Sequence, residues 1–172
     1  EHVYGALEMG FTPKFLGRPG AYRFWGTLDG NGKRRRSRFG VTEDYTAMGA
    51  GISFDQEVSD GVGLFFRLGY RDTHNTAYTT RTSWSLGTQL TVGNIIKERP
   101  NDIIGLAYSQ ISPTDRDFGK NSTEEQFVEA YYNWYLTDNF QISGILQYID
   151  GRNGSKTLDD VTLFGARVQA NF

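Results

Sequence analysis

The sequence predicts an all-β fold class, a transmembrane antiparallel β-barrel of the outer membrane. Nine segments of this 172-residue chain alternate apolar and polar residues for about ten positions each. The apolar residues of all nine can be placed on one continuous outer face. Most connections on one predicted side are also shorter than those on the other, as in outer-membrane barrels.

The alternation is clear in the segment 62–72. Leu64 and Phe66 fall on one face of the predicted strand and Arg67 falls on the other, because successive side chains of a strand point to opposite sides. The last segment repeats this pattern up to Phe172. A soluble β-sandwich also alternates, but it buries its apolar faces against each other and uses shorter strands. We therefore favour the barrel.

The pattern also predicts the strands and their connections. We expect strands at residues 3–13, 20–29, 45–56, 61–72, 82–93, 102–112, 124–137, 139–150 and 160–172. With Phe172 at the periplasmic end, the outer connections are 30–44, 73–81, 113–123 and 151–159. The inner ones are 14–19, 57–60, 94–101 and 137–139. The inner segment 94–101 is as long as some outer loops, and the sequence offers no reason for its length.

The strand count and the inward charges indicate a wider barrel than nine strands form. Bacterial single-chain barrels have an even number of strands. Charged side chains on the inward row need water, which a narrow, side-chain-filled barrel lacks; this row holds Glu8, Arg23, Asp29, Asp55, Arg67, Arg71, Glu129 and Arg167. We expect residues 1–172 to be one barrel domain whose N-terminal strands are missing from the chain.

Two further groups of side chains are predicted to lie outside the lumen. Outward aromatic residues are expected to form girdles at the membrane interfaces: Tyr22, Phe24, Trp84, Tyr108, Tyr132, Trp134, Phe140 and Tyr148. The basic run 33–38 (Lys-Arg-Arg-Arg-Ser-Arg) falls in a predicted outer loop. It could hold lipopolysaccharide phosphates or attract anionic solutes, although charge runs are more often simply solvated.

Composition excludes several kinds of chemistry. The chain has no Cys, and therefore no disulfide, thiolate metal site or Cys nucleophile. Its net charge of −2 gives no reason to expect a nucleic-acid partner. We expect neither a metal nor a cofactor.

Four stretches resemble the carbohydrate-selective porins of the OprB type. They are 20–26 (Gly-Ala-Tyr-Arg-Phe-Trp-Gly), 49–72 with its Gln56-x-x-Ser59-Asp60 turn, 101–108 and 129–149. The resemblance implies the C-terminal half of a sixteen-stranded barrel formed by one chain in the Gram-negative outer membrane. It also implies passive diffusion of small sugars and polar solutes, without enzymatic turnover.

A mixed aromatic and charged lumen would suit such a channel. Aromatic rings offer a flat apolar surface to the CH face of a sugar, while charged groups bind its hydroxyls weakly enough for passage. The candidate pore-lining residues are Arg23, Trp25, Phe65, Arg67, Arg71, Glu129, Tyr131, Tyr135 and Arg167. For each one the alternative is a purely structural role, because paired charges also stiffen porin walls.

Three other functions stay open at this point. The chain could form a porin for other solutes or for solutes in general, or a structural barrel subunit of the outer membrane. A barrel hydrolase is a further alternative, and it needs a positioned base. The two histidines are His2 and His74, and no spacing supports a triad of His74 with Asp72 and Ser83.

The expected partners follow from the barrel and from the resemblance. They are small sugars, outer-membrane lipid and lipopolysaccharide, with a homo-oligomer as a possibility. The barrel-assembly machinery is expected to recognise the last strand through Phe172, because that strand ends in an aromatic residue.

Overall fold

The computed structural model describes residues 3–35, 42–72, 80–113 and 123–171. For residues 31–35 and 42–45 it describes the backbone only. The strands are β1 (Tyr4–Phe11), β2 (Lys14–Phe15), β3 (Arg18–Arg35), β4 (Thr42–Ser59), β5 (Val62–Arg71), β6 (Thr80–Thr91), β7 (Ile103–Pro113), β8 (Glu125–Thr137), β9 (Phe140–Asp150) and β10 (Val161–Ala170). Two short 3-10 helices, η1 (Val92–Asn94) and η3 (Arg152–Gly154), lie between strands.

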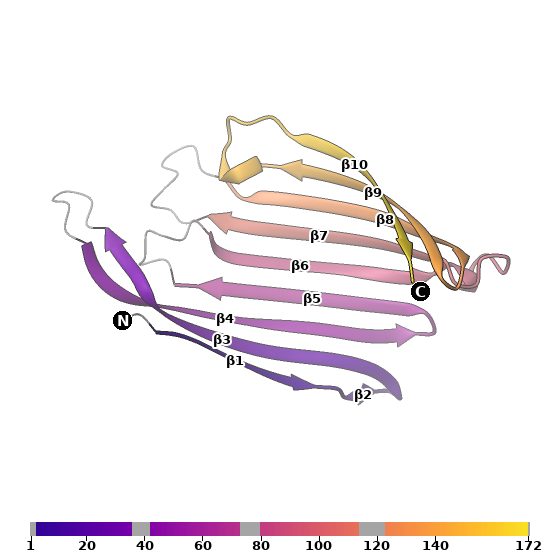
Figure 1. The fold of residues 1–172 in the computed structure, drawn as a ribbon, viewed down its shortest axis with the longest axis horizontal. Coiled ribbons are helices and arrows are strands. Elements are labelled where there is room, and N and C mark those ends of the chain that lie inside the picture. Colours follow the sequence, from indigo (N-terminus) through magenta and orange to yellow (C-terminus); the bar gives the residue numbers. More distant parts are fainter. Residues whose placement is uncertain (1–2, 36–41, 73–79, 114–122, 172) are drawn as a thin grey trace.

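All of the long strands belong to one antiparallel sheet in which each pairs with its neighbours along the chain, from β1 at one edge to β10 at the other (Figure 1). The nine predicted strands are confirmed in number and order, and β2 is a two-residue addition that pairs with the start of β3. β1 begins at the end of the sheet where the long connections lie, and β10 ends at the other (Figure 1). We call these the long-loop end and the short-turn end.

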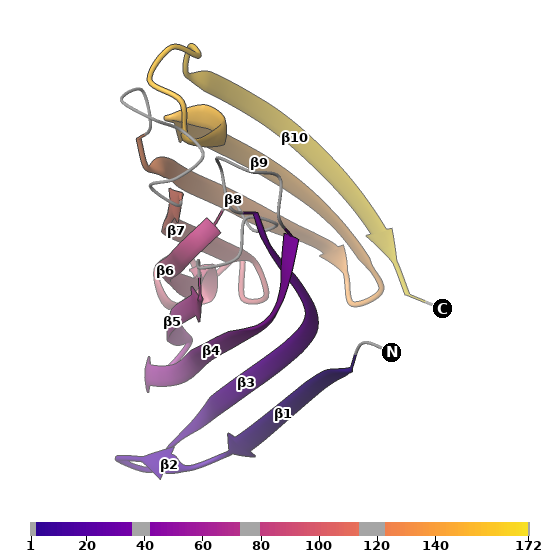
Figure 2. The same ribbon diagram turned by 90° about the vertical axis from the view of Figure 1, so that its left-hand side faces the viewer.

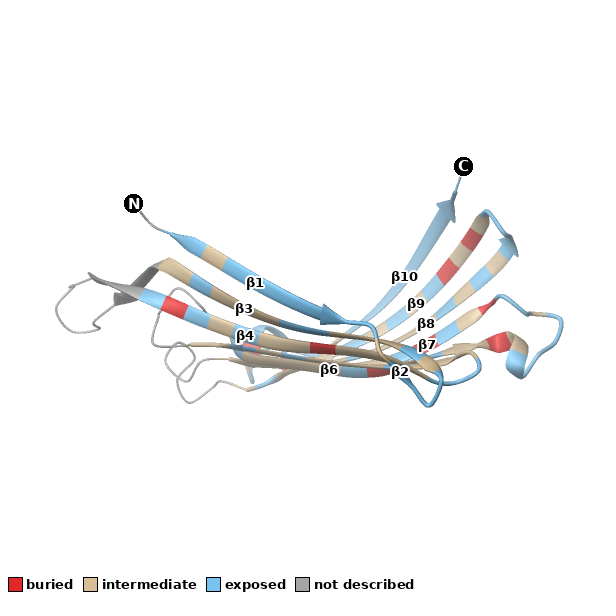
Figure 3. Cartoon of the chain, turned by 90° about the horizontal axis from the view of Figure 1, so that it is seen from below, coloured by how far each residue is buried: buried red, intermediate tan, exposed pale blue. Residues whose placement is uncertain are grey.

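The sheet is bent into a trough whose two rims are β1 and β10 (Figures 2 and 3). Bending crowds the side chains on the concave face and spreads those on the convex face. In β8 the residues alternate accordingly: Glu129 and Tyr131 are half-buried, whereas Val128, Tyr132 and Trp134 are exposed. The crowded face carries the residues predicted to point inward, so the concave side is the predicted lumen side.

The sheet has almost no apolar core. Ala47 and Val92 are the buried hydrophobic residues of the described part. Large apolar side chains instead line the convex face, among them Leu86, Leu106 and Phe164, which is 83% exposed. Soluble domains do not expose a continuous apolar face of this size, so the convex face fits contact with lipid. No helix of the described residues is long and apolar enough to cross a membrane.

The predicted bounds of the outer connection at 30–44 were wrong, because β3 continues to Arg35 and β4 begins at Thr42. After a register shift between Asp29 and Gly32, Lys33 pairs with Asp44 and Arg34 with Glu43 along the backbone. The rest of the basic run, residues 36–38, lies outside the described residues, as do Phe172, His2 and His74.

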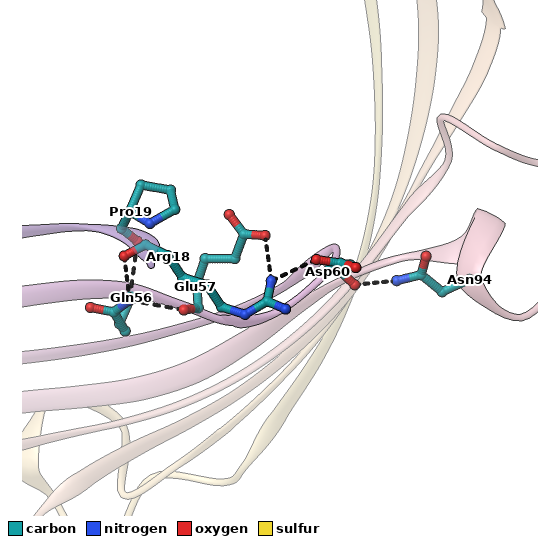
Figure 4. Close-up of polar contacts among 6 residues, drawn as sticks. All are labelled: Arg18, Pro19, Gln56, Glu57, Asp60 and Asn94. Atoms are coloured by element: carbon teal, nitrogen blue, oxygen red, sulfur yellow. Dashed lines mark hydrogen bonds and ion pairs between the residues drawn. The ribbon is translucent and has the colours of Figure 1, made fainter. Parts of the chain in front are cut away.

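Polar side chains tie the strands together at the short-turn end (Figure 4). Arg18 Nη1 lies 2.7 Å from Asp60 Oδ1 and 3.3 Å from Glu57 Oε1, which joins β3 to the β4–β5 turn. Asn94 in η1 donates to the Asp60 carbonyl, and Gln56 Nε2 donates to the Glu57 carbonyl at 2.8 Å. These contacts connect the start of β3, the β4–β5 turn and η1.

Candidate pore lining

The concave face of β3, β4 and β5 carries a charged cluster. Arg67 Nη2 lies 2.7 Å from Asp55 Oδ1, and Arg67 Nη1 donates to the Phe54 carbonyl at 2.9 Å. Arg23 Nη1 approaches the other oxygen of Asp55 at 4.0 Å. These three charged side chains are 38% to 48% exposed. Two guanidinium groups thus share one carboxylate on a wall that stays open to solvent.

Aromatic rings on the concave face lie flat across glycines of the next strand. Trp25 faces Gly51 in the ladder, and a Cβ added to Gly51 would lie only 2.1 Å from Trp25 Cζ2. Phe65 covers Gly87 in the same way, with 2.4 Å between an added Cβ and Phe65 Cε1. Only glycine leaves room for these rings against the backbone, so the glycines fix where each ring lies on the wall.

Phe65 connects the aromatic rings to the charged cluster. The Arg67 guanidinium carbon lies 5.1 Å from the centre of the Phe65 ring, within cation–π distance. The charged cluster, Phe65 and Trp25 therefore form one continuous surface of apolar rings and hydrogen-bond donors on β3, β4 and β5.

Two hollows flank this surface. One of about 280 Å³ lies beside Trp25 and Arg67, and its polar lining includes Ser53, Ser83, Ser85 and Ser109. Ser53 Oγ is buried and has no hydrogen-bond partner among the described residues. The other, of about 380 Å³, is lined by Asp55, Phe65 and Gln89 among others. Both hollows offer polar groups next to an aromatic ring.

A second polar group lies on β8. Tyr131 packs on Gly105 as Trp25 packs on Gly51, with 2.3 Å between an added Cβ and Tyr131 Cε1. Its hydroxyl donates to Gln89 Oε1 on β6 at 3.3 Å. Glu129 accepts a hydrogen bond from Gln147 on β9. Gln89 thus connects this group to the hollow beside Phe65.

The other three predicted pore-lining residues lie apart from these two groups. Arg71 is on the concave face opposite Gly49, near the long-loop end of β5. Tyr135 lies near the short-turn end of β8. Arg167 is on the edge strand β10, where it donates to Gln169 at 2.9 Å. For these three, as for the other six candidates, the role as pore lining stays a prediction.

Sequence reasoning missed the small residues of this surface. The serines of the hollow, Gln89, Gln147 and the glycines beneath the rings were not singled out. The sequence signal for them is weak. Inward glycines and serines recur in the alternation, but which of them faces an aromatic ring depends on the register between strands.

The convex face shows aromatic contacts of a different kind. Tyr22 and Phe24 both meet Phe54 edge-on, with ring centres 5.1 Å and 5.8 Å apart. Trp84 and Tyr108 lie 5.2 Å apart on β6 and β7. These rings support each other on the exposed apolar side, as girdle residues do. Their depth in a membrane stays a prediction.

A curved antiparallel sheet with an apolar convex face and a polar, aromatic concave face is the wall of a β-barrel with a water-accessible lumen, the architecture of porins. Residues 23–172 match the model of the OprB family, described as carbohydrate-selective porins. The chain belongs to this family. Among curated proteins no match was found.

A solved structure supports the same fold. The high-pH structure of Pseudomonas putida OprB superposes with a TM-score of 0.84 and 19% sequence identity, over 98% of this chain and 48% of that one. The chain therefore spans about half the length of this structural neighbour. At this identity the likeness concerns the fold alone.

Proposed function

We propose that this chain forms part of the wall of a passive channel for small sugars in the Gram-negative outer membrane. The observation that carries the proposal is the concave surface of Trp25 and Phe65 beside Arg23, Asp55 and Arg67. It combines ring faces for the CH groups of a sugar with charged and hydroxyl groups for its hydroxyls. No step of covalent chemistry is needed.

The geometry of this concave surface suits the passage of a sugar rather than its retention. The rings lie flat along the wall, and the charged cluster is partly solvated, so each contact with a sugar is weak. Several weak contacts in succession let a solute enter and leave quickly. The hollows beside Trp25 and Phe65 would place such contacts side by side on β3 to β7.

The proposal includes the rest of the barrel. We propose that residues 1–172 are the C-terminal part of one sixteen-stranded domain, in which further strands pair with β1 and β10. The greater length of the structural neighbour supports this, and open strand edges are not tolerated in hydrocarbon.

The proposed partners beyond sugars are membrane lipid, lipopolysaccharide near the basic run 33–38, and the assembly machinery through Phe172. A homo-oligomer is compatible with this arrangement.

Single-channel recording on the complete barrel tests the sugar proposal. Neutral monosaccharides should partly block the ion current, and Trp25→Ala should weaken the block by a few-fold, because one aromatic contact is worth about 0.5–1.5 kcal/mol. The matched control is Phe24→Ala, which removes a ring from the convex face of the same strand. Absence of any sugar block at millimolar concentration in the unaltered channel would refute the proposal.

One observation favours a second candidate, a porin for anionic solutes. Arg23 and Arg67 share the single carboxylate of Asp55, so this part of the lumen carries an excess of positive charge. Stronger block by dicarboxylates than by neutral sugars would favour this alternative.

A further inference from the structure

The connection between β6 and β7 is a folded segment, which explains the length of the predicted inner loop at 94–101. The Val92 amide donates to the Asp102 carbonyl at 2.8 Å, which closes the segment at its base. The amides of Ile95 and Ile96 donate back to the Val92 carbonyl, both at 2.8 Å, and that of Arg99 donates to the Ile96 carbonyl at 3.0 Å. The segment thus has a fixed shape.

Asp102 attaches this segment to the convex face of the sheet. Its side chain is 2% exposed, the lowest value among the described ion-pair partners. Oδ2 accepts the Tyr132 hydroxyl at 2.6 Å, and Oδ1 accepts the Tyr135 amide at 2.9 Å. Tyr132 lies on the convex face, opposite Ile104 in the ladder. The segment therefore leans outward, away from the lumen.

Arg99 is held in place on the same side. Its Nε lies 3.7 Å from Asp102 Oδ2, and its guanidinium carbon lies 5.0 Å from the centre of the Trp134 ring. The ion pair with Asp102 is made through Nε, and no other carboxylate of the described residues forms an ion pair with Arg99. The side chain is 41% exposed. An oxyanion arriving from outside can therefore reach a pre-positioned guanidinium.

The surroundings of Arg99 match the chemistry of a membrane surface. Ile95 and Ile96 are 73% and 47% exposed, although both are apolar. Lys97, also exposed, follows them directly. Trp residues favour the level of lipid headgroups, and Lys and Arg extend toward it. Apolar, aromatic and cationic side chains thus come together on the convex face at the short-turn end.

We propose that this segment binds the phosphate of a phospholipid headgroup in the periplasmic leaflet, with Arg99 and Lys97 as its ligands and Ile95 and Ile96 among the acyl chains. The proposal rests on the proposed function and on the orientation predicted from the sequence, in which the short-turn end is periplasmic. Glu98 lies between the two cations in sequence and opposes anion binding. Its removal should therefore strengthen the site.

Lipid binding to the complete barrel can be measured by native mass spectrometry, with phosphatidylglycerol added to the detergent-solubilised protein. We expect Arg99→Gln and Lys97→Gln each to weaken the first binding step roughly fivefold, since a cation at a membrane surface contributes about 1 kcal/mol. Glu98→Gln should tighten binding. The matched control is Arg152→Gln, which makes the same charge change at the long-loop end and should leave the first step unchanged.

Several outcomes would overturn the inference. Equal binding by Arg99→Gln and the unaltered barrel would show that the site is absent. Competition by inorganic phosphate at the lipid's concentration would indicate a free-anion site, and a change of oligomeric state in place of lipid binding would indicate contact with a second copy. Sugar block recorded on the same variants should not change, so failure here leaves the channel proposal standing. Retained heat-modifiable gel mobility confirms that each variant is folded.

Discussion

The concave and convex faces of this sheet use the same backbone but stabilise their side chains in opposite ways. On the concave face, polar groups pair across strands, as Arg67 does with Asp55 and Gln147 with Glu129. On the convex face, apolar side chains such as Leu86 stay exposed, and aromatic rings such as Trp84 and Tyr108 pack against each other. The comparison shows that the solvent of each face, more than internal packing, selects its residues.

The largest effect should come from a charge placed on the convex face. Leu106→Arg on β7 should lower the free energy of unfolding of the complete barrel in lipid by about 2–4 kcal/mol, because the charge must enter hydrocarbon. The control Gln147→Arg adds the same charge on the concave face opposite Glu129 and should be almost neutral. Denaturant titration in vesicles measures both. Equal losses would mean that the two faces are not distinct.

A methyl group added beneath an aromatic ring of the concave face should lower the free energy of unfolding somewhat less than a charge on the convex face. Gly51→Ala should displace Trp25, lower the free energy of unfolding by about 1–3 kcal/mol as overpacking does, and weaken sugar block. Gly63→Ala is the matched control, since a Cβ at Gly63 would have no heavy atom within 4 Å. Unfolding titrations and single-channel recordings on both variants test this. Similar behaviour of the two would show that the ring does not need the glycine.

The buried carboxylate of Asp102 is the exception on the convex side. Asp102→Ala leaves the Tyr132 hydroxyl and the Tyr135 amide without their acceptor, which should cost about 1–3 kcal/mol of unfolding free energy. Asp102→Asn keeps an acceptor oxygen and should recover part of this loss. Hydrogen exchange at the Tyr135 amide gives a local readout. An unchanged exchange rate in Asp102→Ala would contradict the anchoring role.

The smallest effect on stability is expected for the concave ion pair. Arg67→Ala should change the free energy of unfolding by less than about 1 kcal/mol, because partly solvated pairs contribute little. It should nevertheless shift the ion selectivity of the channel toward cations, since it leaves Asp55 with Arg23 alone. Reversal potentials in a salt gradient measure the shift. A large loss of stability with unchanged selectivity would assign Arg67 a structural role instead.

Much of the wall could be predicted from the sequence because a period of two is a direct consequence of strand geometry. The alternation around Arg67 and Phe66 assigned the faces and the strand order correctly. The ends of β3 and β4 could not be predicted in this way. Lys33 and Arg34 look like loop residues in isolation, and only the backbone pairing with residues 44 and 43 places them in a strand.

The candidate site was only partly predictable, for a physical reason. Polar and aromatic residue types identified Trp25, Phe65 and Arg67, but their grouping required the register between strands. Asp102 gave no signal at all. Its importance depends on Tyr132, thirty residues later in the chain, and on a segment that folds outward.

The glycines beneath the rings have a consequence for how the strands find their partners. A slip of two residues preserves the alternation, so hydrophobicity alone cannot distinguish correct from incorrect pairing. Such a slip would place Phe65 opposite Ser85 or Gln89 in place of Gly87, and Tyr131 opposite Ile103 or Ala107. Neither alternative leaves room for a flat ring. The fit of the rings to the glycines thus favours the observed register over near-miss pairings that alternation alone would allow.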